Sequence, residues 1–160
     1  MTIPAPLDLW RETVRPEWID YNGHMNVAYY VLILDHAVDA FWDYVGLGAE
    51  NLKRHNGSTF AVEAHVTYAK ELMAGAPVRC TSRLIGVDEK RIHHYHELWH
   101  AEEGTLSATA EFLSLYVDMG LRKVAPMPKD IQDRFADVLA AHSALPLPDK
   151  LGHVIRMPGR

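Results

Sequence analysis

The sequence of 160 residues contains a single cysteine, Cys80. One cysteine cannot form a disulfide within the chain, and such cysteine usage favours a reducing, cytoplasmic compartment. No apolar run reaches the length of a membrane-spanning helix, and residues 1–9 lack the basic and apolar segments of a signal peptide. Blocks of positive charge are also missing, and the net charge is −5. We therefore expect no membrane and no nucleic acid among the partners.

The composition that remains is that of an ordinary globular protein. Hydrophobic residues make up 48% of the chain and charged residues 23%. The length is sufficient for one domain with a core of its own, and no internal repeat divides it. We predict a single domain over residues 1–142 and an extended tail over 143–160, because prolines recur in that tail.

The stretch 18–45 organises the rest of the chain. It combines the end of a strand, a polar turn and a long helix. The dipeptide Asn22-Gly23 favours a turn, because glycine adopts positive φ without a Cβ clash. Asn26 is a good N-cap for a helix that begins at Val27. Apolar residues then occur on nearly every face of this helix, so we expect it to be buried on several sides.

Five strands and a second helix are expected around that long helix. The strands are predicted at 7–18, 58–68, 77–87, 91–102 and 105–118, and the helix at 128–142. The segment 50–57 fits either a short helical turn or a plain loop. Short connections between the last four strands favour an antiparallel meander. The sequence therefore predicts an α+β fold in which a curved antiparallel sheet wraps around one long central helix, with the C-terminal helix on the surface.

The strand expected at 58–68 alternates in character. One face carries Phe60, Val62, Ala64, Val66 and Tyr68. Glu63 and His65 leave the opposite face together. These two residues fit two roles equally well: catalytic groups that orient water or accept a proton beside Asp20 of a neighbouring subunit, or a hydrogen-bonded pair in a dimer seam.

Asp20 is the strongest single candidate for catalysis. Its carboxylate comes just before a helix N-terminus, whose free N–H groups attract developing negative charge. A carboxylate beside such donors suits ester or thioester hydrolysis, as general base or nucleophile. The alternative is that Asp20 and Asn26 serve only as turn and cap residues, which is the commoner use of these residue types.

Taken together, these segments resemble the hotdog-fold thioesterases of the 4-hydroxybenzoyl-CoA thioesterase type. The resemblance runs from about Leu9 to Pro128. It rests on the loop 20–26, on Tyr29 and Tyr30, on 64–68, and on 116–118 followed by Arg122-Lys123. A closer resemblance, carried by 18–25 and 88–93, links the chain to the betainyl-CoA thioesterases of carnitine breakdown.

The resemblance implies an acyl-CoA thioesterase in which the loop aspartate, here Asp20, is catalytic. It also implies a cytoplasmic enzyme that needs no metal or other cofactor. Each active site is expected across a dimer interface, in a homodimer or homotetramer. The alternatives are a hotdog hydratase or dehydratase, for which His24 and His36 are available, and a non-catalytic acyl-CoA-binding protein.

Three further groups of residues complete the predicted site. Loop and oxyanion contacts are expected from Gly23, His24, Asn26 and Val27. An acyl pocket is expected from Trp18, Tyr21, Tyr29 and Tyr30, whose rings either fill space or hold a quaternary ammonium. CoA phosphates are expected at Lys70, Arg79, Lys90 and Arg91, for which ordinary solvated charge is the alternative. His94, His96 and His100 share a strand face, but no cysteine or carboxylate completes a zinc spacing, so we predict no metal.

Overall fold

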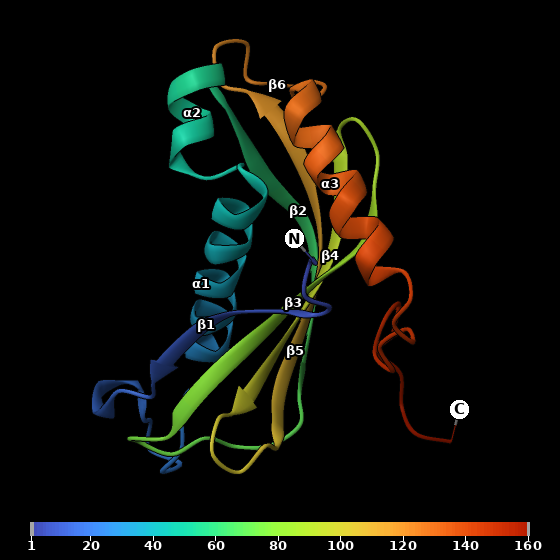
Figure 1. The fold of residues 1–160 in the computed structure, drawn as a ribbon. Helices are drawn as coiled ribbons and strands as arrows, with labels where there is room; N and C mark the ends of the chain where they lie inside the picture. Colours follow the sequence, from blue (N-terminus) through green and yellow to red (C-terminus); the bar gives the residue numbers. More distant parts are fainter. Residues whose placement is uncertain (1, 160) are drawn as a thin grey trace.

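The computed structural model describes residues 2–159 (Figure 1). In chain order the elements are β1 (Leu7–Thr13), a 3₁₀ turn (Pro16–Trp18), α1 (Val27–Val45), α2 (Ala49–His55), β2 (Gly57–Tyr68), β3 (Pro77–Val87), β4 (Arg91–His100), β5 (Leu106–Asp118), β6 (Lys123–Val124) and α3 (Lys129–His142). Within residues 2–159, no helix is both long and apolar enough to cross a membrane.

The largest change to a predicted boundary is at the end of the first strand. The first strand ends at Thr13 rather than at Trp18, because Pro16 opens a 3₁₀ turn and cannot donate to a ladder. The uncertain connection before β2 is the short helix α2, which ends at Asn56 in the left-handed conformation. The strand β6, which pairs with the end of β5, had no counterpart in the prediction.

The helix α1 begins and ends as its sequence predicts. The Asn26 side chain accepts a hydrogen bond from the Ala28 N–H at 3.0 Å, and Gly46 ends the helix with φ of 88°. Burial is one-sided, however. Ile33, Ala37 and Phe41 lie in the core, whereas Val27 remains 58% exposed. The expectation of a helix buried on several sides is therefore wrong for one chain alone, because the sheet covers only part of α1.

The sheet is antiparallel throughout, with the strand order β1-β3-β4-β5-β2. The predicted four-strand meander is correct for β3, β4 and β5 but wrong for β2. This strand pairs with β5, because β1 occupies the flank of β3 where a preceding hairpin strand would lie. The connection 69–76 consequently joins two strands that are not neighbours in the sheet, and β2 is an edge strand.

A β-bulge in β2 corrects the predicted faces. The register with β5 shifts between Ala61 and Glu63, which leaves Val62 as the extra residue. Phe60 pairs with Leu115 and Ala64 with Phe112; because these partners are three residues apart on β5, they face opposite ways. Phe60 and Ala64 therefore do not share a face, since the bulge reverses the alternation.

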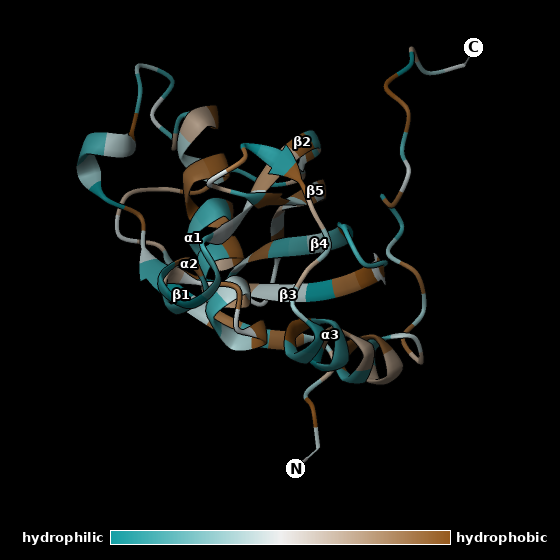
Figure 2. Ribbon diagram, turned by 90° about the horizontal axis from the view of Figure 1, so that it is seen from above, coloured by the Kyte–Doolittle hydropathy of each residue, from teal (hydrophilic) through white to brown (hydrophobic). Residues whose placement is uncertain are grey.

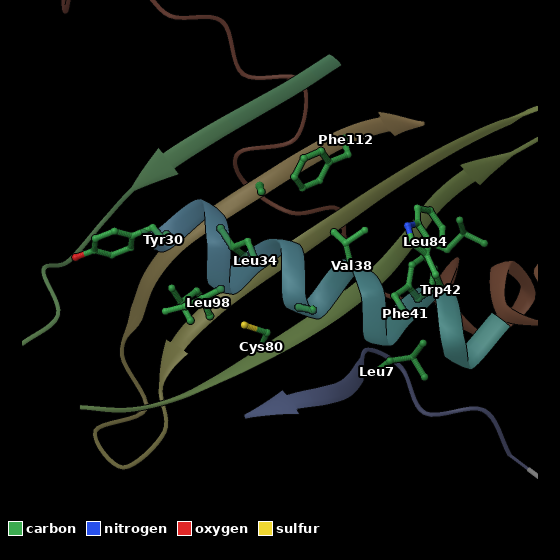
Figure 3. Close-up of a cluster of buried hydrophobic side chains, with 14 of the residues drawn as sticks. Leu7, Tyr30, Leu34, Val38, Phe41, Trp42, Cys80, Leu84, Leu98 and Phe112 are labelled. Carbon is green, nitrogen blue, oxygen red and sulfur yellow. The ribbon is translucent and has the colours of Figure 1, made fainter. Parts of the chain in front are cut away.

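The core lies between α1 and the concave face of the sheet. Figure 3 shows Phe41 and Trp42 of α1 beside Leu84, while Cys80 and Leu98 project from β3 and β4 toward the same helix. Burial raises the pKa of the Cys80 thiol to about 12, so this cysteine is an inert core residue.

Two histidines on the helix-facing side of β4 form a buried hydrogen-bonded chain. Ser82 Oγ lies 2.9 Å from His96 Nδ1, His96 Nε2 lies 2.7 Å from His94 Nδ1, and His94 Nε2 lies 3.0 Å from Ser114 Oγ. Burial lowers the pKa of His94 well below its usual range and that of His96 to about 3. Both rings are therefore neutral and act as donors and acceptors for each other.

The helix α3 and the tail cover one side of β3. Phe135 of α3 meets Phe41 of α1 edge to face, and the Leu84 N–H donates to His142 Nδ1 at 2.9 Å. Arg83 donates to the carbonyls of Leu145 and Pro146 at the start of the tail. The chain after α3 then continues without helix or strand, and its hydropathy alternates along this stretch (Figures 1 and 2). It returns to the outer face of the sheet, where the Gly152 N–H donates to a Glu111 carboxylate oxygen at 2.7 Å.

Candidate active site

The loop before α1 is a tight turn closed by backbone hydrogen bonds. The Asp20 N–H donates to the His24 carbonyl at 3.2 Å, and the Gly23 N–H donates to the Asp20 carbonyl at 3.0 Å. Gly23 has a φ of 83°, which a residue with a Cβ rarely adopts. The Asn26 N–H donates to the Trp18 carbonyl at 2.9 Å and joins the loop to the start of α1. Local geometry thus fixes where the Asp20 carboxylate lies.

Both oxygens of the Asp20 carboxylate accept hydrogen bonds. Oδ1 accepts from the Asn22 N–H at 2.8 Å, and Oδ2 accepts from Asn26 Nδ2 at 3.0 Å. The pKa of Asp20 is lowered, chiefly by the Asn22 N–H and also by the Asn26 amide and nearby His24. Asp20 is consequently an ionised carboxylate that Asn26 links to the first turn of α1, and this geometry serves the turn and the chemistry alike.

His24, the Val27 amide and His36 are other residues predicted to take part in the chemistry. His24 is half-buried, with Nδ1 3.2 Å from the Met25 carbonyl and Nε2 3.9 Å from a Glu71 oxygen. In the described part of the chain, the N–H of Val27 donates no hydrogen bond. That amide is therefore the free donor nearest to Asp20 in sequence on the first turn of α1. His36, the second histidine considered for a hydratase, is engaged with Glu12 at 2.7 Å.

The four aromatic residues predicted for an acyl pocket do not converge within one chain. Trp18 stacks on Tyr29 with ring centroids 5.3 Å apart. Tyr30 is buried, and its hydroxyl accepts from the Leu72 N–H at 2.9 Å. Tyr21 is 98% exposed at the tip of the loop. Their assignment to an acyl pocket remains a prediction, and in a single chain only the Trp18–Tyr29 stack is formed.

Glu63 and His65 lie on the side of the sheet that faces away from α1. They line a cavity of about 440 Å³ together with His93, Glu111 and His153. Glu111 lies 2.8 Å from His93 Nε2 and accepts from the Gly152 N–H at 2.7 Å, and the His65 ring lies 5.6 Å from that of His153. Because the sheet separates this cavity from α1, the structure does not bring Glu63 or His65 to Asp20 of the same chain.

The four residues predicted for CoA phosphates fall into two separate pairs. Lys90 and Arg91 lie at the turn between β3 and β4, whereas Lys70 and Arg79 lie at the opposite end of the sheet. The length of β3 places the pairs roughly 25 Å or more apart. Each side chain already meets a carboxylate, for example Lys70 with Glu103 at 2.9 Å. The four residues therefore cannot all contact the phosphates of one CoA within one chain.

The sequence analysis missed a second cavity, of about 460 Å³, between the C-terminal half of α1 and the first half of β2. Three carboxylates of α1 line it, those of Asp35, Asp39 and Asp43. Their spacing of four residues on an otherwise apolar helix was the available signal, because it places them on one face. The aromatic walls, Trp42 and Phe112, come from elements far apart in the sequence and gave no such signal.

The thioesterase-like superfamily matches residues 14–135. The betainyl-CoA thioesterase of Pseudomonas aeruginosa is 35% identical over 95% of this chain and 96% of its own length. An L-carnitine dehydrogenase/betainyl-CoA thioesterase of Agrobacterium fabrum is 36% identical over 94% of this chain, which corresponds to 31% of that longer protein.

A solved structure extends the similarity to the whole fold. A Staphylococcus aureus protein determined in complex with CoA superimposes with a TM-score of 0.87 and 28% sequence identity, covering 99% of this chain and 100% of that one. The predicted hotdog fold and thioesterase resemblance are therefore confirmed. The chain belongs to the thioesterase-like superfamily and is an acyl-CoA thioesterase, a hydrolase of thioester bonds.

Proposed function

We propose that the enzyme hydrolyses betainyl-CoA to glycine betaine and CoA in carnitine breakdown. The observation that carries the chemistry is the ionised Asp20 carboxylate, bridged by Asn26 to the N-terminus of α1. The acyl group is supported by the similarity to a betainyl-CoA thioesterase over nearly the full length of both chains.

In the proposed reaction, Asp20 acts on the thioester carbonyl in one of two ways. As general base it takes a proton from water while the water oxygen bonds to the carbonyl carbon. As nucleophile it forms an acyl anhydride that water then cleaves. In both routes the carbon–sulfur bond breaks and the CoA thiolate leaves and is protonated. The Val27 N–H is the proposed donor to the oxyanion, and we propose that no metal or other cofactor takes part.

We further propose a dimer that forms through the edge of β2, with a tetramer of two such dimers as the alternative. This strand leaves one row of backbone groups unpaired in the single chain. The apolar Phe60 and Val62 are exposed along it, and Val31 and Leu32 are exposed on the uncovered side of α1. Pairing two copies in this way would cover all of these groups. A cytoplasmic location accords with the single, buried Cys80.

The substrate is tested by steady-state kinetics with a thiol reagent that detects released CoA. Betainyl-CoA is compared with 3,3-dimethylbutyryl-CoA, which replaces the quaternary nitrogen by carbon, and with palmitoyl-CoA. We expect betainyl-CoA to have the highest kcat/KM by at least tenfold, since a fixed cation is recognised by aromatic faces and carboxylates. Equal hydrolysis of the neutral ester would remove betainyl-CoA as the substrate and leave a general acyl-CoA thioesterase.

A further inference from the structure

The cavity between α1 and the first half of β2 is a chamber whose lining combines aromatic rings with carboxylates. We propose that this cavity binds the quaternary ammonium end of the acyl group, in the composite site that the family resemblance implies, with Asp20 of the partner subunit as the reacting carboxylate. This inference rests on the proposed function, because it assigns the place in which that substrate's cation is recognised.

The walls suit a cation that cannot form hydrogen bonds. Trp42 and Phe112 line the cavity, with the ring of His94 between them: its centroid lies 4.8 Å from that of Trp42 and 5.3 Å from that of Phe112. His94 is neutral, because burial lowers its pKa, so it adds no repulsive charge. Methyl groups around a quaternary nitrogen bind well to such aromatic faces.

The charge of the cavity has one sign. Asp35, Asp39 and Asp43 follow one another at intervals of one turn along α1, and none of the described residues that line the cavity is Lys or Arg. Within residues 2–159, none of the three carboxylates forms an ion pair. Burial, and then the charges of its two neighbours, raise the pKa of Asp39. A bound cation would relieve this repulsion without any proton transfer.

The absence of a side chain at Gly48 leaves the space that the Asp43 carboxylate occupies. A Cβ on Gly48 would lie 1.8 Å from Asp43 Oδ1, so the carboxylate occupies space that any other residue would fill. Asp43 therefore lies close to Gly48, just before α2, at one side of the cavity. Asp39, in the middle of the acidic row, is the carboxylate best placed to meet the ligand.

Distance assigns the reacting group to another chain. Thirteen residues of helix separate Asn26 from Asp39, which corresponds to ~20 Å. The nitrogen of a betainyl group is only two bonds from the carbonyl carbon. One substrate therefore cannot reach Asp39 and Asp20 of the same chain together.

The strand β2 shows how a partner supplies Asp20. At its C-terminal end the Tyr68 hydroxyl donates to the Val27 carbonyl, at 3.3 Å, beside the start of α1. At its N-terminal end Ser58, Thr59 and Ala61 line the cavity. Antiparallel pairing of two β2 edges about a two-fold axis places the C-terminal end of one beside the N-terminal end of the other. The partner's Asp20 loop then lies next to this cavity.

The first test measures specificity in Asp39→Asn, which keeps the shape of an exposed side chain and removes its charge. We expect the ratio of kcat/KM for betainyl-CoA to that for 3,3-dimethylbutyryl-CoA to fall on the order of tenfold, with the neutral ester unaffected. Asp137→Asn, on the exposed face of α3, removes the same charge elsewhere and should leave the ratio unchanged. Trp42→Phe should lower the ratio too, because phenyl binds cations less well than indole.

The outcomes separate this inference from the proposed function. If the wild-type enzyme does not prefer betainyl-CoA, the proposed function fails. If the wild-type enzyme prefers it and Asp39→Asn keeps the full preference, the proposed function stands and the cavity assignment is overturned. An equal loss of preference in Asp39→Asn and Asp137→Asn would also overturn it, because the effect would then be the net charge of the molecule.

The second test asks which chains share a site. Asp20→Asn and Asp39→Asn proteins are co-expressed with different tags, and the mixed dimers are purified. If each site takes Asp20 from one chain and the cavity from the other, one of the two sites in every mixed dimer is intact. Such dimers should then recover about half of the wild-type activity on betainyl-CoA. Activity no higher than the mean of the two parent variants would place both residues in one chain and refute the shared site.

Discussion

The loop before α1 and the C-terminal half of α1 place their carboxylates in opposite environments. At the N-terminal end, both oxygens of Asp20 accept hydrogen bonds and its pKa is lowered. In the C-terminal half of the helix, burial and then the charges of Asp35 and Asp43 raise the pKa of Asp39. The first carboxylate is stabilised as an anion by its own loop, whereas the second lacks a stabilising partner within the described chain.

This difference indicates different tasks. A reacting carboxylate must keep one position and one charge state, which the turn 20–26 provides. A binding carboxylate gains most when its repulsion is relieved only by the ligand, since binding then stabilises the complex more than the free enzyme. The single chain separates these tasks by about 20 Å of helix, and the proposed dimer would bring them together.

The largest effect is expected when Asp20, whose carboxylate oxygens both accept hydrogen bonds, is changed. Asp20→Asn keeps an oxygen for the Asn22 N–H but removes the charge that acts on the thioester. Turnover should fall by a factor of ~10²–10⁴ in steady-state assays with betainyl-CoA.

The thermal midpoint provides the control for this variant. The turn should survive, because an Asn side chain can still accept from the Asn22 N–H, so the Tm should remain close to that of the wild type. Near-wild-type turnover in a well-folded Asp20→Asn protein would leave Asp20 with only the turn role.

A smaller but still large effect is expected when the proposed dimer is disrupted, because Asp20 of one chain is then separated from Asp39 of the other. Val62, the extra residue of the β2 bulge, is 54% exposed on the free edge. Val62→Lys places like charges at the proposed seam, and lysine on an edge strand opposes pairing. We expect light scattering to show a shift toward monomer, and kcat/KM to fall by roughly tenfold or more as the shared sites are lost.

The matched control is Leu121→Lys, the same substitution at a position 71% exposed in the turn after β5. It should change neither the mass in solution nor the activity. A fully active Val62→Lys monomer would show that one chain contains the whole site. It would contradict the proposal that Asp20 of one chain acts beside Asp39 of the other.

The same contrast explains what the sequence could and could not reveal. The turn at 20–26 and the Asn26 cap depend on neighbours within a few residues, and both were predicted at their correct positions. Asp39 belongs to a cavity whose other walls come from β2, β4 and β5. Such a site depends on how distant strands are ordered, which local propensities do not determine.

The strand order shows the same limit. Short connections correctly predicted β3, β4 and β5 as neighbours, but the same reasoning wrongly placed β2 beside β3, whereas β2 pairs with β5. The bulge at Val62 was invisible in the sequence, because alternation looks unbroken when one residue is inserted among apolar ones. Glu63 and His65 were therefore assigned together correctly, but nothing in the sequence placed them on the side away from α1.

A moderate effect is expected on stability in acid, beneath the C-terminal half of α1. The unfolded chain protonates His94 and His96 near pH 6.5, whereas burial lowers the pKa of both in the folded protein, that of His96 to about 3. Their contribution is therefore present above pH ~6.5 and is lost as the pH falls toward the folded pKa values. Between pH 7.5 and 5, protonation of each ring in the unfolded chain should lower the free energy of unfolding by about 2 kcal/mol.

Urea unfolding at these two pH values, at one protein concentration, measures the change. His55→Gln is the control, because His55 is exposed on α2 and its loss should leave the pH dependence intact. A free energy of unfolding that does not fall between pH 7.5 and 5 would contradict the assignment of His94 and His96 as neutral, buried rings.

The smallest effect is expected when Tyr21, at the tip of the Asp20 loop, is changed. This side chain is 98% exposed in the single chain, so Tyr21→Ala should change the free energy of unfolding by no more than about 0.5 kcal/mol. If the dimer brings the loop to the partner's cavity, the ring can cover the bound cation there, and the kcat/KM for betainyl-CoA should fall roughly 2- to 30-fold. The neutral 3,3-dimethylbutyryl ester should lose less. Equal losses on both esters would assign the ring to packing against the acyl chain, and no loss on either would leave Tyr21 outside the site.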